Sequence, residues 1–199
     1  MKILHVINNL GTGGAEKLLL DTIPMFNKKG CKVDLLLIDG TNYPYLNKLK
    51  EINCCEIYTL NSKNIYNPLN IFKIIKFINK YDLFHVHLFP AQYWVVLAKL
   101  ISFSKTKLIF TEHSTSNTRI EYPIFRFIDR FIYRFYDKVV CITLEIKNVL
   151  TSHANLDSNK LVVVENGINV DLFNKANPIE KKDIDKNILD SHKLLIQVA

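Results

Sequence analysis

The sequence predicts an α/β fold, a Rossmann-like parallel sheet with helices on both faces. Short β-rich runs alternate with amphipathic helical stretches along the chain, which is the order that builds a parallel sheet. The run KVDLLLID (Lys32–Asp39) is almost continuously apolar, as strands covered on both faces are. The chain of 199 residues has no internal repeat and no low-complexity tract. It is long enough for one large domain of this class.

Each predicted element carries a local signal, because strands are apolar and β-branched while helices repeat apolar residues at helical spacing. Gly30 ends the first helix, and Asn67 is expected to cap the third helix, with Pro68 at its first position. The predicted strands are Lys2–Ile7, Lys32–Asp39, Glu56–Leu60, Asp82–Leu88, Lys107–His113, Lys138–Thr143 and Lys160–Gly167. The predicted helices are Ala15–Lys29, Tyr45–Ile52, the run after Asn67, Ala91–Phe103, Ile124–Tyr136 and the run between Thr143 and His153.

The end of the chain differs in composition from the rest. Residues 1–173 form the predicted Rossmann-like domain, and residues 174–192 are a polar, lysine-rich stretch that we expect to be a linker. Residues 193–199, KLLIQVA, are predicted to begin a new strand. A linker followed by one strand favours the first piece of a second domain whose remainder is absent. The alternative is a final strand that completes the sheet.

Composition is that of an ordinary globular protein, with 48% hydrophobic and 23% charged residues. No apolar run approaches the roughly 20 residues that span a bilayer. The N-terminal MKILHVINNL lacks the longer apolar stretch and the cleavage site of a signal peptide, so we expect a cytoplasmic protein. The cysteines show no CxxC spacing and are expected to be free thiols: Cys31, Cys54, Cys55 and Cys141.

The net charge of +7 and the pI near 9.1 point to anionic partners, such as phosphates, an acidic membrane surface or nucleic acid. The chain has one Trp and no run of basic and aromatic residues typical of a nucleic-acid module. Nucleic acid is therefore not an expected partner.

A glycine-rich loop, NNLGTGGAE, joins the first strand to the first helix. Such a backbone can approach a ligand closely, and a helix N-terminus favours negative charge. A dinucleotide fingerprint needs a third glycine where this chain has Glu16, although Asp39 could still hold a ribose. A P-loop sequence is absent. Dinucleotide binding is thereby weakened, and nucleoside triphosphate hydrolysis is not expected.

Five motifs follow one another at domain-scale spacing: GTGGAE, DLFHVHL, TEHS, VVCIT and VVVENGINVDLF (Val162–Phe173). Each lies at or beside a predicted strand. In type and order they resemble the GT-B glycosyltransferases of family 4, the "group 1" kind, over essentially all of residues 1–199. Members of that family move a sugar from a nucleotide-sugar donor.

The resemblance implies that two domains share the work. The donor nucleotide is held mainly by a C-terminal domain and a glycan or lipid-linked acceptor mainly by the N-terminal one, with reaction in the cleft between them. It also implies a retaining, metal-independent transfer without a cofactor, in the synthesis of surface polysaccharide or glycolipid. The family's donor-binding basic residues and paired glutamates would lie beyond Ala199, so this chain alone is expected to be inactive.

The resemblance also assigns roles to particular residues. Gly13 and Gly14 would let the backbone approach the donor diphosphate, while Glu16 would contact the acceptor or simply complement the helix dipole. His113, at a strand end, would point into the cleft and orient a hydroxyl or stabilise developing charge. His87, near another strand end, is expected to line the cleft.

His85 and His87 alternate on one strand and therefore share a face, with His85 expected to be buried. With His113 they are the residue types of a three-histidine zinc site. A carboxylate motif that would support a metal is missing, and the family's transfer is metal-independent, so no metal is expected. Glu112 should face the opposite side of the strand from His113 and play a structural role.

Two residues follow the last predicted strands. Thr143 would hydrogen-bond a ligand or, as an equally good interpretation, cap the next helix. Asn166, with Gly167, is predicted to form a tight turn facing the cleft.

The segment EYPIFRFIDRFIYRFYDK predicts a helix with a basic stripe made of Arg126, Arg130, Arg134 and Lys138. An apolar stripe beside it contains Phe127, Phe131 and Phe135. If part of the apolar surface is exposed, the helix would suit an anionic membrane at its inner face, or a lipid-pyrophosphate acceptor held there. The alternative is a core-packing helix whose basic edge is solvated and partly paired with Asp129 and Asp137.

Two other functions stay open. One is a non-catalytic module that recognises a nucleotide-sugar or glycan partner. The other is a nucleotide-dependent oxidoreductase, which Glu16 disfavours.

Overall fold

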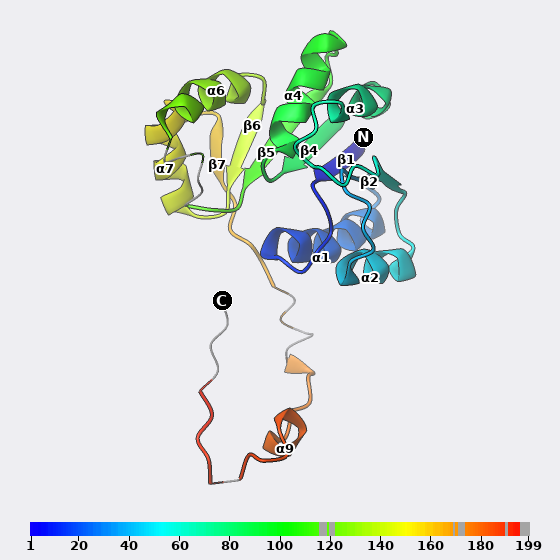
Figure 1. The fold of residues 1–199 in the computed structure, drawn as a ribbon, viewed down its shortest axis with the longest axis vertical. Coiled ribbons are helices and arrows are strands. Elements are labelled where there is room, and N and C mark those ends of the chain that lie inside the picture. The colour runs from blue at the N-terminus through cyan, green and yellow to red at the C-terminus, as the bar shows by residue number, and fades with distance from the viewer. Residues whose placement is uncertain (116–118, 120–121, 169, 171–173, 190, 196–199) are drawn as a thin grey trace. The chain divides into compact units, whose positions relative to one another are not determined.

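The computed structural model describes residues 1–115, 119, 122–168, 170, 174–189 and 191–195 (Figure 1). The chain divides into two compact units, Met1–Asn166 and Gly167–Ala199. The first unit contains the sheet, and the second contains the short helix α9 (Lys181–Ile184).

The first unit is built on a parallel seven-stranded sheet in the order β3-β2-β1-β4-β5-β6-β7. The chain starts in the middle of the sheet, runs out to β3, and returns to place β4 against the other side of β1. This switch in direction confirms the predicted Rossmann-like α/β fold. The strands are β1 (Lys2–Ile7), β2 (Lys32–Leu37), β3 (Ile57–Thr59), β4 (Leu83–His87), β5 (Lys107–Glu112), β6 (Lys138–Cys141) and β7 (Leu161–Val163).

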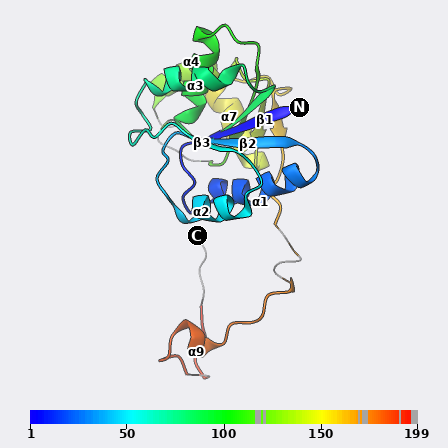
Figure 2. The ribbon, with the colours of Figure 1, turned by 90° about the vertical axis from the view of Figure 1, so that its right-hand side faces the viewer.

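Helices cover both faces of the sheet (Figure 2). One face packs on α1 (Gly14–Lys28) and α2 (Pro44–Ile52), and the other packs on α3 (Asn70–Ile78), α4 (Ala91–Ile101), α6 (Pro123–Tyr133) and α7 (Leu144–Ala154). Neighbouring side chains of a strand point to opposite faces. Val6 of β1 therefore belongs to the core under α3 and α4, whereas Ile7 belongs to the core under α1 and α2.

Element ends differ most from the predictions. The strand predicted over Lys160–Gly167 is paired only over Leu161–Val163, because its partner strand β6 ends at Cys141. α3 begins at Asn70 with Leu69 as its N-cap, later than the predicted start after Asn67. Asn67 nevertheless accepts a hydrogen bond from the Leu69 amide at 3.0 Å, the bond expected of a capping side chain, in the turn that leads into α3.

In the second unit, α9 interrupts the predicted linker at residues 174–192. Residues 193–195 adopt no regular structure, and residues 196–199 lie outside the described residues. The predicted domain boundary at residue 173 also falls outside them. The predicted second domain and its first strand therefore stay predictions.

Two compositional features are visible in the structure. All four cysteines are free thiols, as predicted, and Cys141 is buried. Within the described residues, every helix is too short or too polar to cross a bilayer.

Candidate functional site

The loops after β1, β4 and β5 meet at the carboxyl edge of the sheet, because these three strands are neighbours. The Asn8 side-chain amide donates a hydrogen bond to the Phe89 carbonyl oxygen at 2.7 Å, which ties the first loop to the second. The Arg119 guanidinium carbon lies 5.4 Å from the centre of the Phe89 ring, which ties the third loop to the second. Ligands of open parallel sheets bind at this edge, so it is the candidate site.

The glycine loop leaves its backbone open at this edge. Gly13 is the extended residue before α1 (φ −78°, ψ 173°), and both Gly13 and Gly14 are exposed. A Cβ at Gly14 would meet no atom within 4 Å, whereas a Cβ at Gly13 would collide with the Glu16 carboxylate. Glu16 thus folds back over the start of α1, where its charge complements the helix dipole.

His113 follows β5 and is half-buried at the carboxyl edge. Its Nε2 lies 3.1 Å from Nδ1 of His87. His87 is 1% exposed, and His85 is half-buried, which reverses the exposures expected for the pair. The reason is that the ring of His87 is enclosed between His113 and His5, so it reaches the edge only through His113.

His5, on β1, completes the group and has no motif to mark it in the sequence. Its Nδ1 lies 2.9 Å from Nε2 of His87, with the two rings stacked. Burial lowers the pKa of both His5 and His87 well below the ordinary value, and the neighbouring histidines add to the shift. Burial lowers the pKa of His85 and of His113 to about 4. These four imidazoles are therefore neutral at pH 7.

Ligating nitrogens of His5, His85 and His87 lie within 4.8 Å of one another. This set differs from the predicted zinc set, which contained His113 in place of His5. The nitrogens already serve other partners: His5 and His87 bond to each other, and His85 Nε2 lies 2.7 Å from the Thr111 hydroxyl. The expectation that the chain holds no metal stays a prediction.

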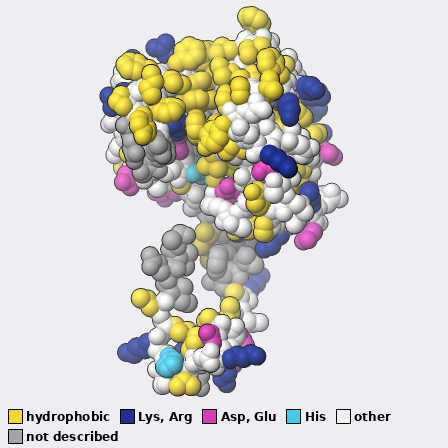
Figure 3. Space-filling view, viewed as in Figure 1, with side chains coloured by type: hydrophobic (Ala, Val, Ile, Leu, Met, Phe, Trp, Pro, Cys, Tyr) yellow, Lys and Arg dark blue, Asp and Glu magenta, His cyan; other side chains and the backbone are white. Residues whose placement is uncertain are grey.

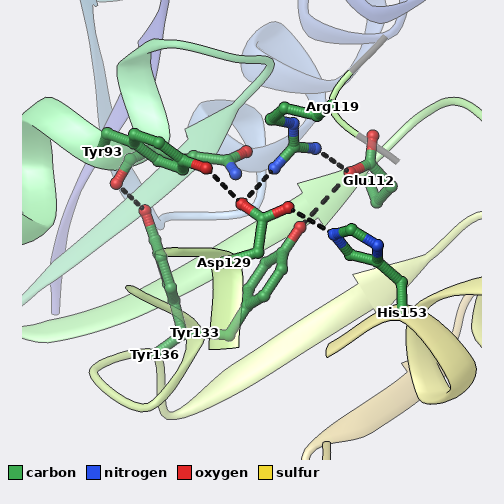
Figure 4. Close-up of polar contacts among 8 residues, drawn as sticks. Tyr93, Glu112, Arg119, Asp129, Tyr133, Tyr136 and His153 are labelled. Carbon is green, nitrogen blue, oxygen red and sulfur yellow. Dashed lines mark hydrogen bonds and ion pairs between the residues drawn. The ribbon is translucent and has the colours of Figure 1, made fainter. Parts of the chain in front are cut away.

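Glu112 faces away from His113, as predicted, into a buried ionic network under α6 (Figure 4). Arg119 bridges the two carboxylates of the network, with 3.0 Å to Glu112 Oε2 and 2.7 Å to Asp129 Oδ1. His153 Nε2 lies 2.8 Å from the other Asp129 oxygen. The hydroxyls of Tyr93 and Tyr133 donate to Asp129 and Glu112, respectively. The alternative interpretation of this helix paired Asp129 with a solvated basic edge, but Asp129 is fully buried.

Burial raises the pKa of Glu112, although Arg119 opposes the shift. Burial lowers the pKa of Arg119, but Tyr133, Asp129 and Glu112 outweigh this effect and raise it overall. Sequence reasoning missed Arg119, because a single arginine between a predicted strand and the next predicted helix gives no sign that it will be buried. The network fixes the end of β5, and with it His113, to α4, α6 and α7.

Thr143 and Asn166 belong to neither the histidine group nor the ionic network around Arg119. The Thr143 hydroxyl oxygen accepts a hydrogen bond from the Ile146 amide at 3.2 Å and so caps α7, which is one of its two expected roles. Asn166 is exposed, and the predicted turn at Asn166 and Gly167 is not formed. Residues 169 and 171–173 of the same motif lie outside the described residues.

The predicted basic stripe is shorter than expected. α6 ends at Tyr133, Arg134 is its C-cap, and Lys138 begins β6, where its ammonium donates to the Asn159 carbonyl at 2.7 Å. An exposed apolar stripe at positions i, i+3, i+4 and i+7 of α6 consists of Ile124, Phe127, Ile128 and Phe131. Phe135, assigned to the apolar stripe, is only partly exposed. Figure 3 shows hydrophobic side chains gathered over this face of the molecule.

A hollow of about 750 Å³ lies at the opposite, amino edge of the sheet, between the starts of β4, β5 and β6. Its lining includes Leu83, Lys107 and Lys138. The loops that carry the glycines and His113 are at the other edge. We therefore do not assign this hollow to the site.

The chain matches the family Glycosyltransferase Family 4 over residues 12–172, which is most of its length. No curated protein matches it in sequence. Among solved structures, Anabaena Alr3699/HepE in complex with UDP and glucose is similar with a TM-score of 0.71 and 19% identity, over 94% of this chain and 49% of that one.

A glycosyltransferase from Rickettsia africae is similar with a TM-score of 0.69 and 23% identity, over 93% of this chain and 48% of that one. A UDP-GlcNAc 2-epimerase from Neisseria meningitidis bound to UDP-GlcNAc has a TM-score of 0.59 and 17% identity, over 82% of this chain and 45% of that one. The chain thus spans about half the length of these structures, and the likeness to them concerns the fold. By the match over residues 12–172, the chain belongs to glycosyltransferase family 4.

Proposed function

We propose that this chain is the acceptor-side half of a glycosyltransferase, which moves a sugar from a nucleotide-sugar donor to a glycan or lipid-linked acceptor. The observation that carries the proposal is the carboxyl edge of the sheet. There an open glycine loop follows β1 and a half-buried neutral histidine, His113, follows β5, and these two strands flank β4 in a family 4 domain.

The glycine loop supports a phosphate-bearing donor. Gly14 has open space where a side chain would be, and it begins α1, whose first amides favour negative charge. A diphosphate could therefore lie against this backbone without displacing a side chain. The UDP in the Anabaena structure is a ligand of this chemical class.

His113 supports a role toward sugar oxygens. Its pKa of about 4 keeps the ring uncharged at neutral pH, so it would form a directed hydrogen bond instead of an ion pair with a phosphate. A hydrogen bond of this kind can orient a hydroxyl or stabilise developing charge.

The second half of the enzyme would lie beyond Ala199. The coverage supports this proposal, since the chain spans about half of the solved structures that it matches. The donor nucleotide would be held mainly there. We propose, from the family resemblance alone, that transfer retains the anomeric configuration and needs no metal or cofactor, and that residues 1–199 are inactive by themselves.

The outer surface of α6 supports a lipid-linked acceptor at an anionic membrane. The stripe of Phe127 and its neighbours is exposed although it is apolar, with Phe127 at 71%. Arg126 and Arg130 flank it, and neither forms an ion pair within the part of the chain that the structure describes. An exposed apolar stripe beside unpaired arginines has the chemistry of a helix lying in an anionic interface. The enzyme would then act at the inner face of a membrane.

Binding to vesicles tests this surface. We expect the chain to sediment with phosphatidylglycerol vesicles and not with phosphatidylcholine vesicles. Phe127→Ser should weaken that binding about 10- to 100-fold, because about 1.5–3 kcal/mol of apolar burial is lost. Phe26→Ser on α1, also an exposed phenylalanine, is the matched control. Equal binding by both variants and the parent chain would contradict the membrane contact.

Sequencing the gene past the codon for Ala199, followed by an assay of the complete protein, tests the main proposal. We expect the reading frame to continue for about another domain. The complete protein should then consume a nucleotide-sugar only when an acceptor is present, whereas residues 1–199 should not. A frame that stops at Ala199 would instead favour the alternative, a non-catalytic module that binds a nucleotide-sugar or a glycan.

A further inference from the structure

Three histidines of the site form a continuous hydrogen-bonded chain that crosses three neighbouring strands. His5 Nδ1 lies 2.9 Å from His87 Nε2, and His87 Nδ1 lies 3.1 Å from His113 Nε2. His5 and His87 are buried, and His113 is the half-buried end of the chain at the carboxyl edge. A fourth ring, His85, packs against the group, but its bond goes to Thr111.

A neutral imidazole has one N–H donor and one acceptor nitrogen. Because His87 uses both nitrogens within the chain, it must donate one hydrogen bond and accept the other. The protons of all three rings therefore point the same way along the chain, either toward His113 or away from it. The two directions leave His113 Nδ1 as a donor or as an acceptor, respectively.

The buried end favours one direction. Within the described residues, His5 Nδ1 has a hydrogen-bond partner, whereas His5 Nε2 has none. If the protons pointed away from His113, His5, a side chain only 3% exposed, would carry its proton on Nε2, an N–H with no partner among the described residues. If they point toward His113, that atom is only an unused acceptor, which is the more tolerable of the two in a protein interior.

We propose that His5 and His87 are positioning residues that fix His113 in the tautomer with its proton on Nδ1. His87 then donates to His113 Nε2, and the Nδ1–H of His113 becomes a hydrogen-bond donor at the carboxyl edge. This inference rests on the proposed function for its purpose. It assigns His113 the task of donating to an oxygen of the transferring sugar or its phosphate, and it leaves that ring without a free lone pair to act as a general base.

The test is a measurement of imidazole tautomers by long-range ¹H–¹⁵N NMR on the chain at pH 7, without substrate. We expect His5, His87 and His113 all to carry the proton on Nδ1, the tautomer that a solvated histidine disfavours. Finding the proton of His113 on Nε2 would overturn the proposal. This outcome is independent of sugar transfer, because the readout needs neither a donor nor an acceptor.

Two variants show whether the hydrogen-bonded chain of histidines fixes the tautomer of His113. His5→Phe removes the donor to His87, so the single tautomer of His113 should give way to a mixture of the two forms. His85→Phe is the matched control, because its ring centre lies as close to His87, at 4.4 Å, but it is not part of the chain. The tautomer of His113 should be unchanged in that variant. An unchanged tautomer of His113 in a folded His5→Phe variant would contradict the proposal. If that variant does not fold, the tautomer of His113 measured in the parent protein remains the test.

Discussion

Glu112 and His113 are adjacent in sequence, yet they belong to two regions with different interactions, one ionic and the other uncharged. Glu112 points under α6 into a network of charges, where Arg119 joins it to Asp129. His113 points to the other face of the strand, into a chain of uncharged rings that begins at buried His5. Side chains alternate across a strand, so one strand end can serve both regions.

The two regions differ in how far they are closed to solvent. The ionic network is sealed, with Glu112, Arg119 and Asp129 each no more than 5% exposed. The histidine chain is buried at one end and reaches the carboxyl edge at the other. We infer that the charged region fixes the strand end and that the uncharged region presents a donor to a ligand.

Breaking the charged region should have the largest effect on stability. Arg119→Met leaves two buried carboxylates without their cation, which is expected to cost about 3–5 kcal/mol of unfolding free energy. Urea denaturation followed by circular dichroism measures it. The exposed Arg126→Met serves as the control and should change stability by less than about 0.5 kcal/mol. Similar small losses in both variants would show that the network does not hold the fold.

Mild acid should lower the free energy of unfolding through the uncharged region of histidines. The four histidines have lowered pKa values, so between about pH 6.5 and pH 4 the unfolded chain binds protons that the folded chain does not. Stability should therefore fall as the pH drops below 6.5, by up to about 1.4 kcal/mol per pH unit for each histidine. Glu112 acts in the opposite direction, because its pKa is raised.

Unfolding free energies at pH 7 and pH 5.5 measure this dependence. His5→Phe should flatten it, whereas the exposed control His192→Gln should leave it as it is. A stability that rises between pH 7 and pH 5.5 in the parent chain would mean that the rings are not held neutral.

A smaller effect on stability is expected from Gly14→Ala. The new methyl group meets no atom within 4 Å, and alanine favours a helix over glycine by up to about 1 kcal/mol, so thermal stability should hold or rise slightly. Activity of the complete protein should nevertheless fall if a diphosphate lies against this backbone. Gly30→Ala is the control, since its φ of +83° makes alanine costly there while it lies away from the carboxyl edge. Loss of activity in Gly30→Ala but not in Gly14→Ala would contradict the role of the loop.

Periodicity was sufficient to predict the fold, because strands and helices alternate with clear apolar patterns from β1 to β7. It also placed the glycine loop and His113 at strand ends, where the structure brings them to one edge. It could not identify His5 as part of the site. The ring of His5 meets His87 only because β1 lies beside β4, and the residues of these two segments do not reveal the order of the strands. The pairing of Arg119 with Asp129 could not be predicted for the same reason, since it depends on how the folded chain brings Arg119 to α6. Lys138 was assigned to a helix that ends earlier, so the basic stripe was drawn too long.

The most direct test of the account is the activity of His113 variants in the complete protein. His113→Ala should lower kcat about 100-fold, as the loss of one preorganised donor does, with little change in melting temperature. His113→Asn should recover part of the rate, because its amide can donate from near the position of Nδ1. His85→Ala, on the same sheet face but outside the chain, should stay within a few-fold of the parent protein. Equal rates for His113→Ala and His85→Ala would contradict the claim that the face of His113 is where the sugar is transferred.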